Sequence, residues 1–343
     1  MTLPDQPTLR KPSRLGLYTP FVVLLVVAIG WVGGWTWMRS EVFRRMDAAA
    51  GTLDASGYRV DWSARSLSGF PFRLDLDIAG PRLREVSGWG LSAPRLKAEA
   101  FVFAPDHWVI VAPDGVTLTR RVGGPVVVTA KALRASLSDE AAHPPRLSVE
   151  GLGLTFAPGP GAAPVAMTAA DELHLHARAG PRDQGAFYLE IDKARTTGGS
   201  LLGDMTAGSP VTLIADAICS HASALTGEGF AGALGGWSGA GGRLTIRRLS
   251  LETGVAGAEA RSGTLAIGGD GRLKGGVDLD LRRGARLLDA VMAHAGTAAQ
   301  AAGSAKAILA AHSQGETARL TVDFLAGQTT LGPVAIGPSP RVY

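Results

Sequence analysis

Cysteine is almost absent from this chain of 343 residues, which contains Cys219 alone. No disulfide can form within one molecule, so the sequence carries no redox signal about its compartment. Net charge is also small, at +4, and the six lysines are scattered along the chain. Leaving out residues 1–14, with three basic residues and one acidic residue, reduces the charge to about +2, which does not favour nucleic acid as a partner.

Long apolar runs are equally scarce, and only one stretch, between Arg14 and Arg39, is both apolar and free of charge. A helix needs about 20 such residues to cross a bilayer. A cleaved signal peptide usually has a shorter apolar region that ends at a small-residue cleavage site, whereas this run ends among tryptophans. We therefore predict a retained transmembrane anchor over residues 17–38. Its membrane–water interface residues are predicted to be Tyr18, Trp31, Trp35 and Trp37.

The charges that flank the anchor do not fix its orientation, because each side carries three basic residues. A short tail before one span and a large domain favours a cytoplasmic tail over residues 1–16 with the bulk exported. Residues 39–56 are predicted to form a juxtamembrane helix that continues the anchor.

From Tyr58 onward the hydrophobic pattern has a period of two. Phe72, Leu74, Leu76 and Ile78 share one face of a predicted strand, with charged residues on the other. The same alternation recurs at 173–177, 187–191, 277–281 and 320–324, with turn signals at 112–115, 123–125 and 268–271. This predicts an antiparallel, mainly β domain over residues 57–343. The Pro/Gly segment 157–163 and the glycine-rich segment 227–242 are candidate boundaries within it.

One segment departs from the strand pattern. Residues 285–314 are rich in Ala, with Leu287, Leu288 and Met292 on one stripe, and predict a helical insertion near the C-terminus. Gly296 and Gly303 are expected to break it into two pieces.

Two architectures fit these strands. One is a β-sandwich with a dry core between two sheets. The other is a long curved sheet whose apolar face lines a groove. Aromatic residues make up only 6% of the chain, and the inward positions are often small or aliphatic, which permits an open groove without demonstrating one.

Several motifs resemble those of a known family. The entry to the first strands, Ser68-Gly-Phe-Pro-Phe-Arg-Leu74, and the later segments 241–254, 263–281, 287–296 and 320–343 resemble domain-of-unknown-function family 2125. This is a group of bacterial proteins anchored in the inner membrane. The late pattern more distantly resembles AsmA-like envelope proteins. The resemblance implies a single-pass inner-membrane protein whose periplasmic domain is a long curved antiparallel sheet with an apolar groove, linked to phospholipid movement.

Candidate chemical groups in the sequence have simpler explanations. His174 and His176 could chelate a metal but have no suitably spaced further ligand. Cys219 with His221 suggests a thiol–imidazole dyad, yet nucleophilic catalysis needs a third orienting group. The paired carboxylates at 75/77 and 278/280 fit the wet face of a sheet. We therefore expect no enzyme activity, no metal and no cofactor.

The sequence favours binding or shielding of a lipid-like apolar ligand, with phospholipid or another acyl compound as partner. The alternative is a non-enzymatic envelope scaffold or assembly factor, with a filled β-core, that recruits other envelope proteins. The predicted groove residues are apolar positions of alternating strands: Phe72, Leu74, Leu76, Ile78, Val277, Leu279, Leu281, Leu320, Val322 and Phe324.

Overall fold

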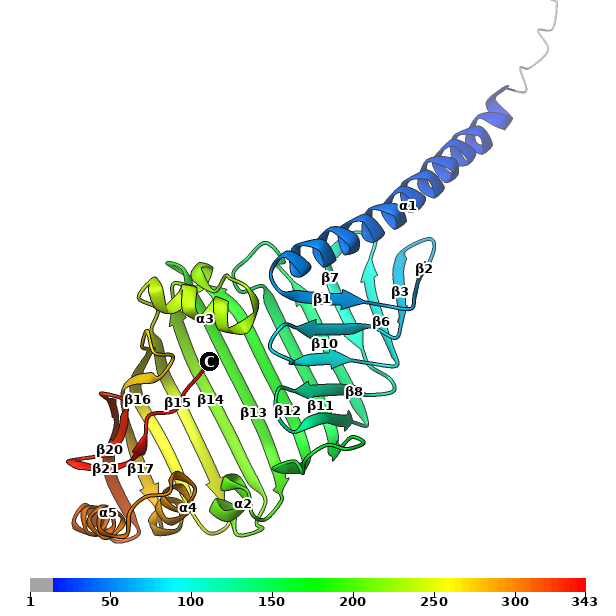
Figure 1. Cartoon of the computed structure of the whole chain (residues 1–343). Coiled ribbons are helices and arrows are strands. Elements are labelled where there is room, and N and C mark those ends of the chain that lie inside the picture. The colour runs from blue at the N-terminus through cyan, green and yellow to red at the C-terminus, as the bar shows by residue number, and fades with distance from the viewer. Residues whose placement is uncertain (1–14) are drawn as a thin grey trace, which may run out of the picture.

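The computed structural model describes residues 15–343, with side chains from Tyr18 onward. Its first element, α1 (Leu15–Ala55), is one continuous helix of 41 residues that projects from a β-rich body (Figure 1). The predicted anchor and the predicted juxtamembrane helix are therefore two parts of one rod. The predicted tail, 1–16, lies outside the described residues apart from the first two positions of α1.

All 21 strands of the described chain belong to one sheet, and every pair of neighbours is antiparallel. This confirms the predicted mainly β fold with a large antiparallel sheet. It also decides between the two architectures that the sequence left open, because a sandwich would divide the strands between two sheets.

The first ten strands form five long strands that are each bent once. β3 pairs with β2 and β6, whereas β4, which continues its line, pairs with β1 and β5. Gaps of only two to four residues separate the two halves of each bent strand, which are as follows: β1 (Tyr58–Asp61) and β2 (Ala64–Ser68); β3 (Arg73–Ala79) and β4 (Arg82–Glu85); β5 (Gly90–Ser92) and β6 (Arg95–Phe101); β7 (Ala104–Val111) and β8 (Val116–Arg120); β9 (Gly124–Thr129) and β10 (Ala132–Ser138). We call β1, β4, β5, β8 and β9 the folded arm.

Residues that cannot continue a ladder occupy several of these bends. Pro81, Pro94 and Pro113 have no amide hydrogen to donate. Gly115 has φ +75°, and a Cβ there would lie 2.3 Å from the Val128 carbonyl oxygen. The predicted turn at 112–115 is therefore a corner within one bent strand. The turns at 123–125 and 268–271 do close hairpins, as predicted.

The rest of the sheet continues with antiparallel strands, of which the seven between residues 146 and 282 are long, with 10 to 14 residues each. Its members are β11 (Arg146–Pro158), β12 (Met167–Gly180), β13 (Gln184–Thr196), β14 (Val211–Ser220), β15 (Leu244–Thr253), β16 (Gly257–Ile267), β17 (Leu273–Arg282), β18 (Ser313–Gln314), β19 (Thr317–Leu325), β20 (Gln328–Leu331) and β21 (Val334–Pro338). β11 joins both parts of the bent region, since β10 pairs with its first half and β9 with its end. The predicted boundary at 157–163 lies at the end of β11 and does not interrupt the sheet.

One apolar row crosses the sheet in register. It consists of Leu67, Leu76, Ala98, Ile110, Ala135, Val149, Leu175, Leu189, Ala215, Leu249, Ala260, Leu279 and Leu320, each paired with the next on the adjacent strand. Because strand side chains alternate between faces, this register gives the sheet one continuous apolar face. We call this face the inner face.

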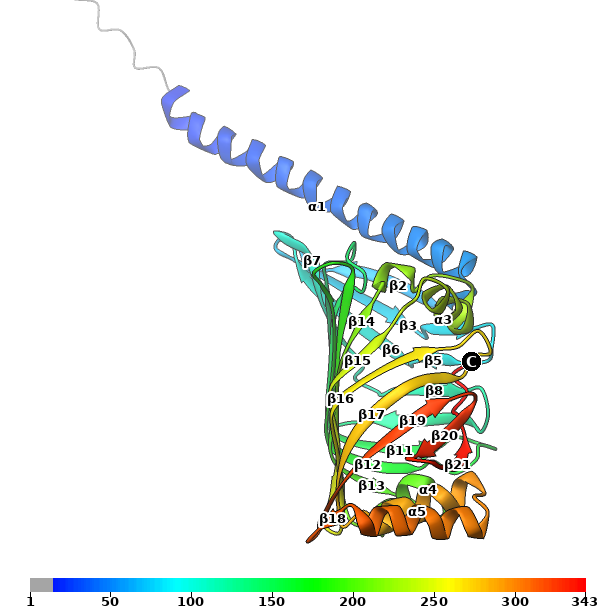
Figure 2. The same cartoon turned by 90° about the vertical axis from the view of Figure 1, so that its left-hand side faces the viewer.

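Short helices lie on the inner side of the curved sheet (Figure 2). They are α2 (Leu201–Thr206), the 3₁₀ turn η1 (Ala222–Ala224), α3 (Gly229–Gly239), α4 (Ala285–Ala295) and α5 (Ala299–Ala311). The predicted helical insertion is present and divides at Gly296, which adopts φ +64° at the end of α4. The predicted break at Gly303 is wrong, since this residue lies inside α5. The glycine-rich segment 227–242 contains α3, and the strands on either side of it, β14 and β15, pair directly with each other in the same sheet.

The two ends of the apolar row are covered by helices. At one end Leu67, Leu74 and Leu76 pack against the second half of α1, through Met38, Val42, Phe43 and Met46. At the other end Leu281 and Leu320 pack with α4 and α5. Between these covers, row residues such as Leu249 remain 44% exposed. The core is therefore divided into several clusters along an open, curved sheet.

Candidate functional site

Two adjoining apolar hollows lie between the folded arm, α3 and the strands β13–β17. The larger has a volume of about 440 Å³ and the smaller about 270 Å³. Both are lined by Phe230 of α3 and by Val342 near the C-terminus, so they meet at these two side chains. Figure 1 shows the C-terminus close to α3, in front of the long strands of the sheet. Together these hollows form the candidate site.

The wall on the arm side is a second cross-strand row. Leu83, Leu91 and Leu118 are paired in register on β4, β5 and β8. Leu91 is 43% exposed and Leu118 38% exposed, although both are large apolar side chains. Tyr58 and Trp89 complete this wall of the larger hollow. Exposed apolar side chains gathered around one concavity are typical of a binding site.

The wall on the sheet side belongs to the inner face. Phe187, Leu244 and Leu265 line the smaller hollow. Phe187 and Leu189 are two residues apart on β13 and therefore point to the same side of the sheet. Since Leu189 belongs to the apolar row, the hollow opens onto the row that crosses the sheet.

α3 connects the two walls because hydrogen bonds hold it from both sides. On the sheet side, Trp237 Nε1 donates to the Ser220 carbonyl oxygen at 2.6 Å, and the Trp237 side chain is buried. On the arm side, the Phe230 amide donates to Glu85 Oε1 at 3.2 Å. Gly229 allows this approach, because a Cβ at its position would lie 2.2 Å from Glu85 Oε1. The helix thereby fixes the distance between the walls.

Two titratable groups of the walls, Tyr58 and Cys219, have a raised pKa. Burial, followed by the nearby Glu85 carboxylate, raises the pKa of Tyr58. Burial likewise raises the pKa of the Cys219 thiol in the smaller hollow. Both groups therefore stay protonated near pH 7, and the charged residues that line the hollows are Glu85 and Arg121 of the larger one, among mainly apolar side chains.

The comparisons with known proteins give one family. The model of a family described as "Uncharacterized protein conserved in bacteria (DUF2125)" matches residues 35–340. The chain belongs to this family. Neither the curated proteins nor the solved structures give a match. The matched range includes α3 and the lining residues of both hollows except Val342 and Tyr343, whereas the first twenty residues of α1 precede it. The more distant AsmA-like resemblance is not shown and stays a prediction.

The predicted groove residues on the first alternating strand lie against α1. Leu74 is fully buried, and Leu76 and Ile78 belong to the same cluster with helix residues. Phe72 precedes β3 and is 58% exposed, with its ring centroid 5.9 Å from that of Trp31. None of these four lines the two apolar hollows.

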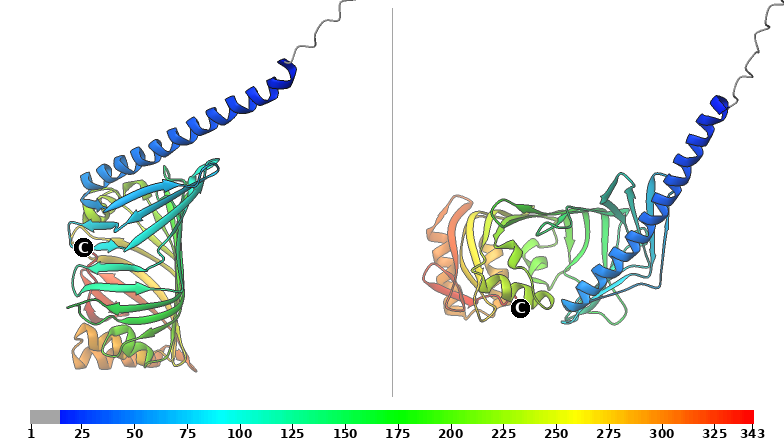
Figure 3. Two further views of the ribbon diagram at one scale, coloured as in Figure 1. Left: turned by 90° about the vertical axis from the view of Figure 1, so that its right-hand side faces the viewer. Right: turned by 90° about the horizontal axis from the view of Figure 1, so that it is seen from above.

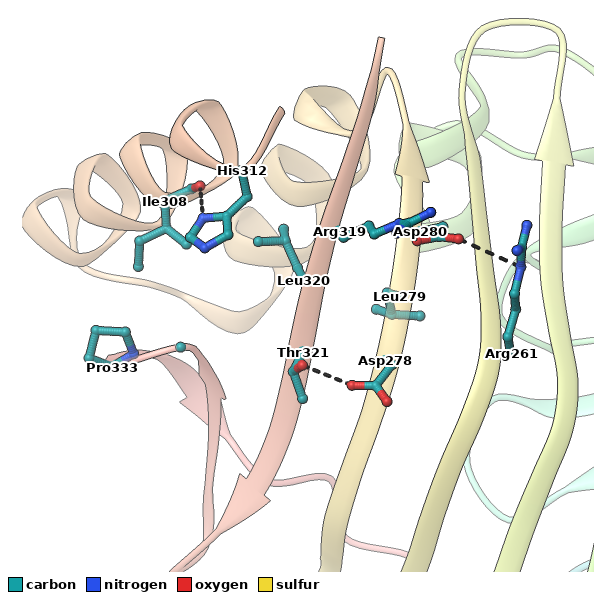
Figure 4. Close-up of a pocket in the computed structure, with 11 residues that line it drawn as sticks. Arg261, Asp278, Leu279, Asp280, Ile308, His312, Arg319, Leu320, Thr321 and Pro333 are labelled. Carbon is teal, nitrogen blue, oxygen red and sulfur yellow. Dashed lines mark hydrogen bonds and ion pairs between the residues drawn. The ribbon is translucent and has the colours of Figure 1, made fainter. Parts of the chain in front are cut away.

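The other six predicted groove residues lie near the opposite end of the row. Val277 and Phe324 belong to one cluster of side chains from β15, β16, β17 and β19. Leu281, Leu320 and Val322 pack with or beside α4 and α5. Leu279 and Leu320 also line a third hollow of about 660 Å³ between α5, β17 and β19 (Figure 4). The sequence thus found residues at both ends of the inner face but not the hollows between them.

The third hollow has a polar wall whose charges are already paired. Asp280 forms ion pairs with Arg319 at 3.2 Å and Arg261 at 3.6 Å. Asp278 accepts hydrogen bonds from Thr321 and Ser262, both at 2.9 Å. Hydrogen bonding, first from Thr321 and then from Ser262, lowers the pKa of Asp278. This mutual satisfaction makes the hollow a weaker candidate for ligand binding than the apolar pair.

The residues of the apolar hollows were missed for identifiable reasons. Leu91 lies on a strand of three residues, which is too short to show alternation. Phe230 and Trp237 lie in α3, whose composition resembles that of a loop. Val342 is distant in sequence from the other lining residues, and only the folded chain brings it to the hollows. The one pattern that could have indicated the site is the row of paired leucines on β4, β5 and β8. That row can be recognised only once the strands are known to be bent.

The predicted interface residues all lie on α1. Tyr18 and Trp37 are exposed along the rod. Trp31 and Trp35 instead contact the β2–β3 hairpin, with their indole N–H groups donating to the carbonyl oxygens of Pro71 at 3.0 Å and Arg73 at 3.2 Å. α1 is long and apolar enough to span a membrane over part of its length, which is compatible with a single-pass anchor.

The candidate catalytic and metal groups are engaged with other partners. His174 Nε2 lies 3.2 Å from Glu172, and His176 Nδ1 lies 2.6 Å from Ser148 Oγ. His221 Nδ1 lies 3.1 Å from Ser220 Oγ, while Cys219 is buried among apolar side chains. Within residues 15–343, no group of three or more His, Cys, Asp and Glu side chains is placed to hold a metal ion.

Proposed function

We propose that this protein is a single-pass inner-membrane protein of the cell envelope that binds or shields a lipid-like apolar ligand on its curved sheet. The observation that carries the proposal is the pair of adjoining apolar hollows joined at Phe230 and Val342. The ligand class is an acyl chain, and phospholipid is the natural source at a membrane. The role is binding and not catalysis.

The size and chemistry of the hollows suit such a ligand. Their volumes, about 440 and 270 Å³, are comparable with those of small-molecule pockets, which run from about 300 to 1,000 Å³. Transfer of an acyl chain from water to such a site gains about 0.8 kcal/mol per methylene group. The apolar row extends the surface beyond the hollows, so that a long chain could lie along the sheet without a charged pocket.

The position of the anchor supports the same role. α1 packs against Leu67 and Leu76, which begin the apolar row, and its other half projects away from the sheet. A membrane crossed by the projecting half would therefore lie beside the start of the inner face. The proposed topology has the N-terminus in the cytoplasm and the sheet in the periplasm.

Photo-crosslinking in cells tests the proposal with the full chain in its own membrane. Benzoyl-phenylalanine replaces Leu91 or Leu118 in the larger hollow, and in a control it replaces Leu325, which is 72% exposed and lines neither hollow. Cells grown with radiolabelled phosphate are then irradiated. We expect labelled phospholipid on the protein for positions 91 and 118 but not 325.

Other outcomes count against lipid binding. Equal labelling at all three positions would mean contact with bulk membrane and not with a site. Crosslinks from positions 91 and 118 to other proteins, without lipid, would favour the scaffold alternative. Absence of any crosslink from the two lining positions, with an intact fold, would overturn the proposal.

A further inference from the structure

Two hairpin tips carry exposed aromatic side chains at the edge of the sheet from which α1 projects. The β2–β3 tip has the sequence Gly69-Phe-Pro-Phe72, and Phe70 and Phe72 are 52% and 58% exposed. The β6–β7 tip has Phe103, which is 76% exposed and stacks on Phe101 at 5.1 Å. Between Glu99 and Asp106 the second tip has no charged residue. Both hairpins project from the body on the side of α1 (Figure 3).

The first tip is attached to α1 through two tryptophans that lie about one helical turn apart. Trp35 packs edge-on against Phe70, with ring centroids 5.7 Å apart, and Trp31 packs against Phe72. Since Leu74 and Leu76 contact α1 further along, at Val42 and Met46, the hairpin runs along the helix toward its N-terminal end. The end of the β2–β3 tip therefore lies at about the same position along the α1 axis as Trp31.

The charge-free part of α1 places Trp31 below the membrane surface. The run Leu15–Met38 has 24 residues, and at 1.5 Å per residue it is about 36 Å long, slightly more than the hydrocarbon core of about 30 Å. When the hydrocarbon core is centred on this run, about 3 Å of the run extends beyond the core at each end. Trp31 lies eight residues before Arg39, about 12 Å along the axis, and thus about 9 Å inside the hydrocarbon.

Hydrogen bonding at the tip suits this depth. In hydrocarbon, backbone polar groups need partners within the protein. The carbonyl oxygens of Pro71 and Arg73 accept from Trp31 and Trp35, and that of Phe72 accepts from the Val102 amide at 3.0 Å. The Gly69 carbonyl oxygen accepts from Arg73 at 2.9 Å, and Pro71 has no amide hydrogen. The same bonds satisfy the indole N–H groups without interfacial water.

We infer that the β2–β3 and β6–β7 tips insert into the lipid layer beside α1, with their phenylalanines among the acyl chains of a phospholipid bilayer. The sheet would then contact the membrane through three elements, which fixes its orientation relative to the bilayer. This inference needs α1 to span the membrane but does not depend on ligand binding in the hollows.

A depth measurement tests the insertion. In a Cys219→Ser background, a single cysteine at Phe103→Cys carries an environment-sensitive fluorophore, and the full chain is placed in phosphatidylcholine nanodiscs that contain doxyl-labelled lipid. Lys97→Cys is the matched control, because Lys97 is exposed on β6, six residues before Phe103 and about 20 Å along the hairpin from it. Val26→Cys, in the middle of the charge-free run, reports whether α1 itself is inserted.

We expect blue-shifted emission and loss of fluorescence to doxyl lipid at positions 26 and 103, with water-like emission quenched by iodide at position 97. Quenching by lipid at 26 but not at 103 would overturn the inference while leaving the anchor and the binding proposal intact. Lipid quenching at 97 as strong as at 103 would also overturn it, since the whole strand and not the tip would then lie on the membrane. Circular dichroism of each labelled protein checks that the sheet is retained.

Discussion

The backbone amide of Phe230 donates a hydrogen bond to Glu85 Oε1, and this bond joins α3 to the folded arm across 145 positions of the chain. Glu85 is only 8% exposed, and it also accepts hydrogen bonds from the amide and hydroxyl groups of Ser87. One carboxylate therefore organises both the β4–β5 connection and the start of the helix over the hollows.

Replacement of this carboxylate should loosen the site. Glu85→Ala leaves the Phe230 and Ser87 amides without their partner, at a cost of about 1–3 kcal/mol in the free energy of unfolding. Thermal unfolding of the full chain in detergent measures the change. Glu228→Ala is the matched control, because Glu228 is exposed at the N-cap of α3 and makes no side-chain cap hydrogen bond. An equal loss of stability in both variants would contradict the assigned role.

The contact of α3 with the sheet gives a second prediction. A Cβ on Gly242 would lie 2.3 Å from Trp237 Cε2, and the Trp237 ring is buried, so it has little room to move. Gly242→Ala should therefore cost about 1–3 kcal/mol through overpacking. Gly239→Ala, inside α3 with open space around it, should be neutral or slightly stabilising. Chemical denaturation compares the two variants, and similar midpoints would show that the ring is not a fixed support for α3.

The fold was largely predictable because alternation is a local signal. Phe72 to Ile78 and Val277 to Leu281 show it over several residues, and one buried face explains it fully. The bends were less accessible, since a Pro-Asp-Gly sequence fits a hairpin turn as well as a corner. What distinguishes the two is the pairing of each half strand with different neighbours, and this is a property of the whole sheet.

The site was harder to predict because it depends on tertiary contacts. Five of the 11 residues of α3 are glycine, and each costs about 1 kcal/mol relative to alanine in a helix. The helix forms because Trp237 and the Glu85 contact hold it, so its own sequence is a poor guide. The hollows combine residues from Tyr58 to Tyr343, and no local pattern connects these segments.

A third prediction separates structural from ligand-binding roles on the inner face. Leu74 is fully buried against the α1 cluster, so Leu74→Ala should cost about 2–5 kcal/mol by leaving a cavity. Leu152→Ala, at a position that is 48% exposed, should change stability by less than about 0.5 kcal/mol. Lipid crosslinking from position 91 should be unchanged in Leu74→Ala at a temperature where it remains folded. Loss of crosslinking there would instead place Leu74 in the ligand path.

The Asp278 carboxylate in the third hollow predicts a defined pH dependence. Hydrogen bonds from Thr321 and Ser262 lower its pKa below the ordinary value of 3.8. A lowered pKa in the folded state stabilises the fold above the unfolded-state value, and this contribution is lost as the pH falls through the lower folded-state value. Asp278→Asn should therefore be less stable than the unmodified chain at pH 7, with the difference shrinking below about pH 3.8. Thr321→Val removes the first donor and should reduce the same pH-dependent difference. Unfolding midpoints between pH 7 and pH 3 measure both, and a difference that stays constant over this range would contradict the assignment.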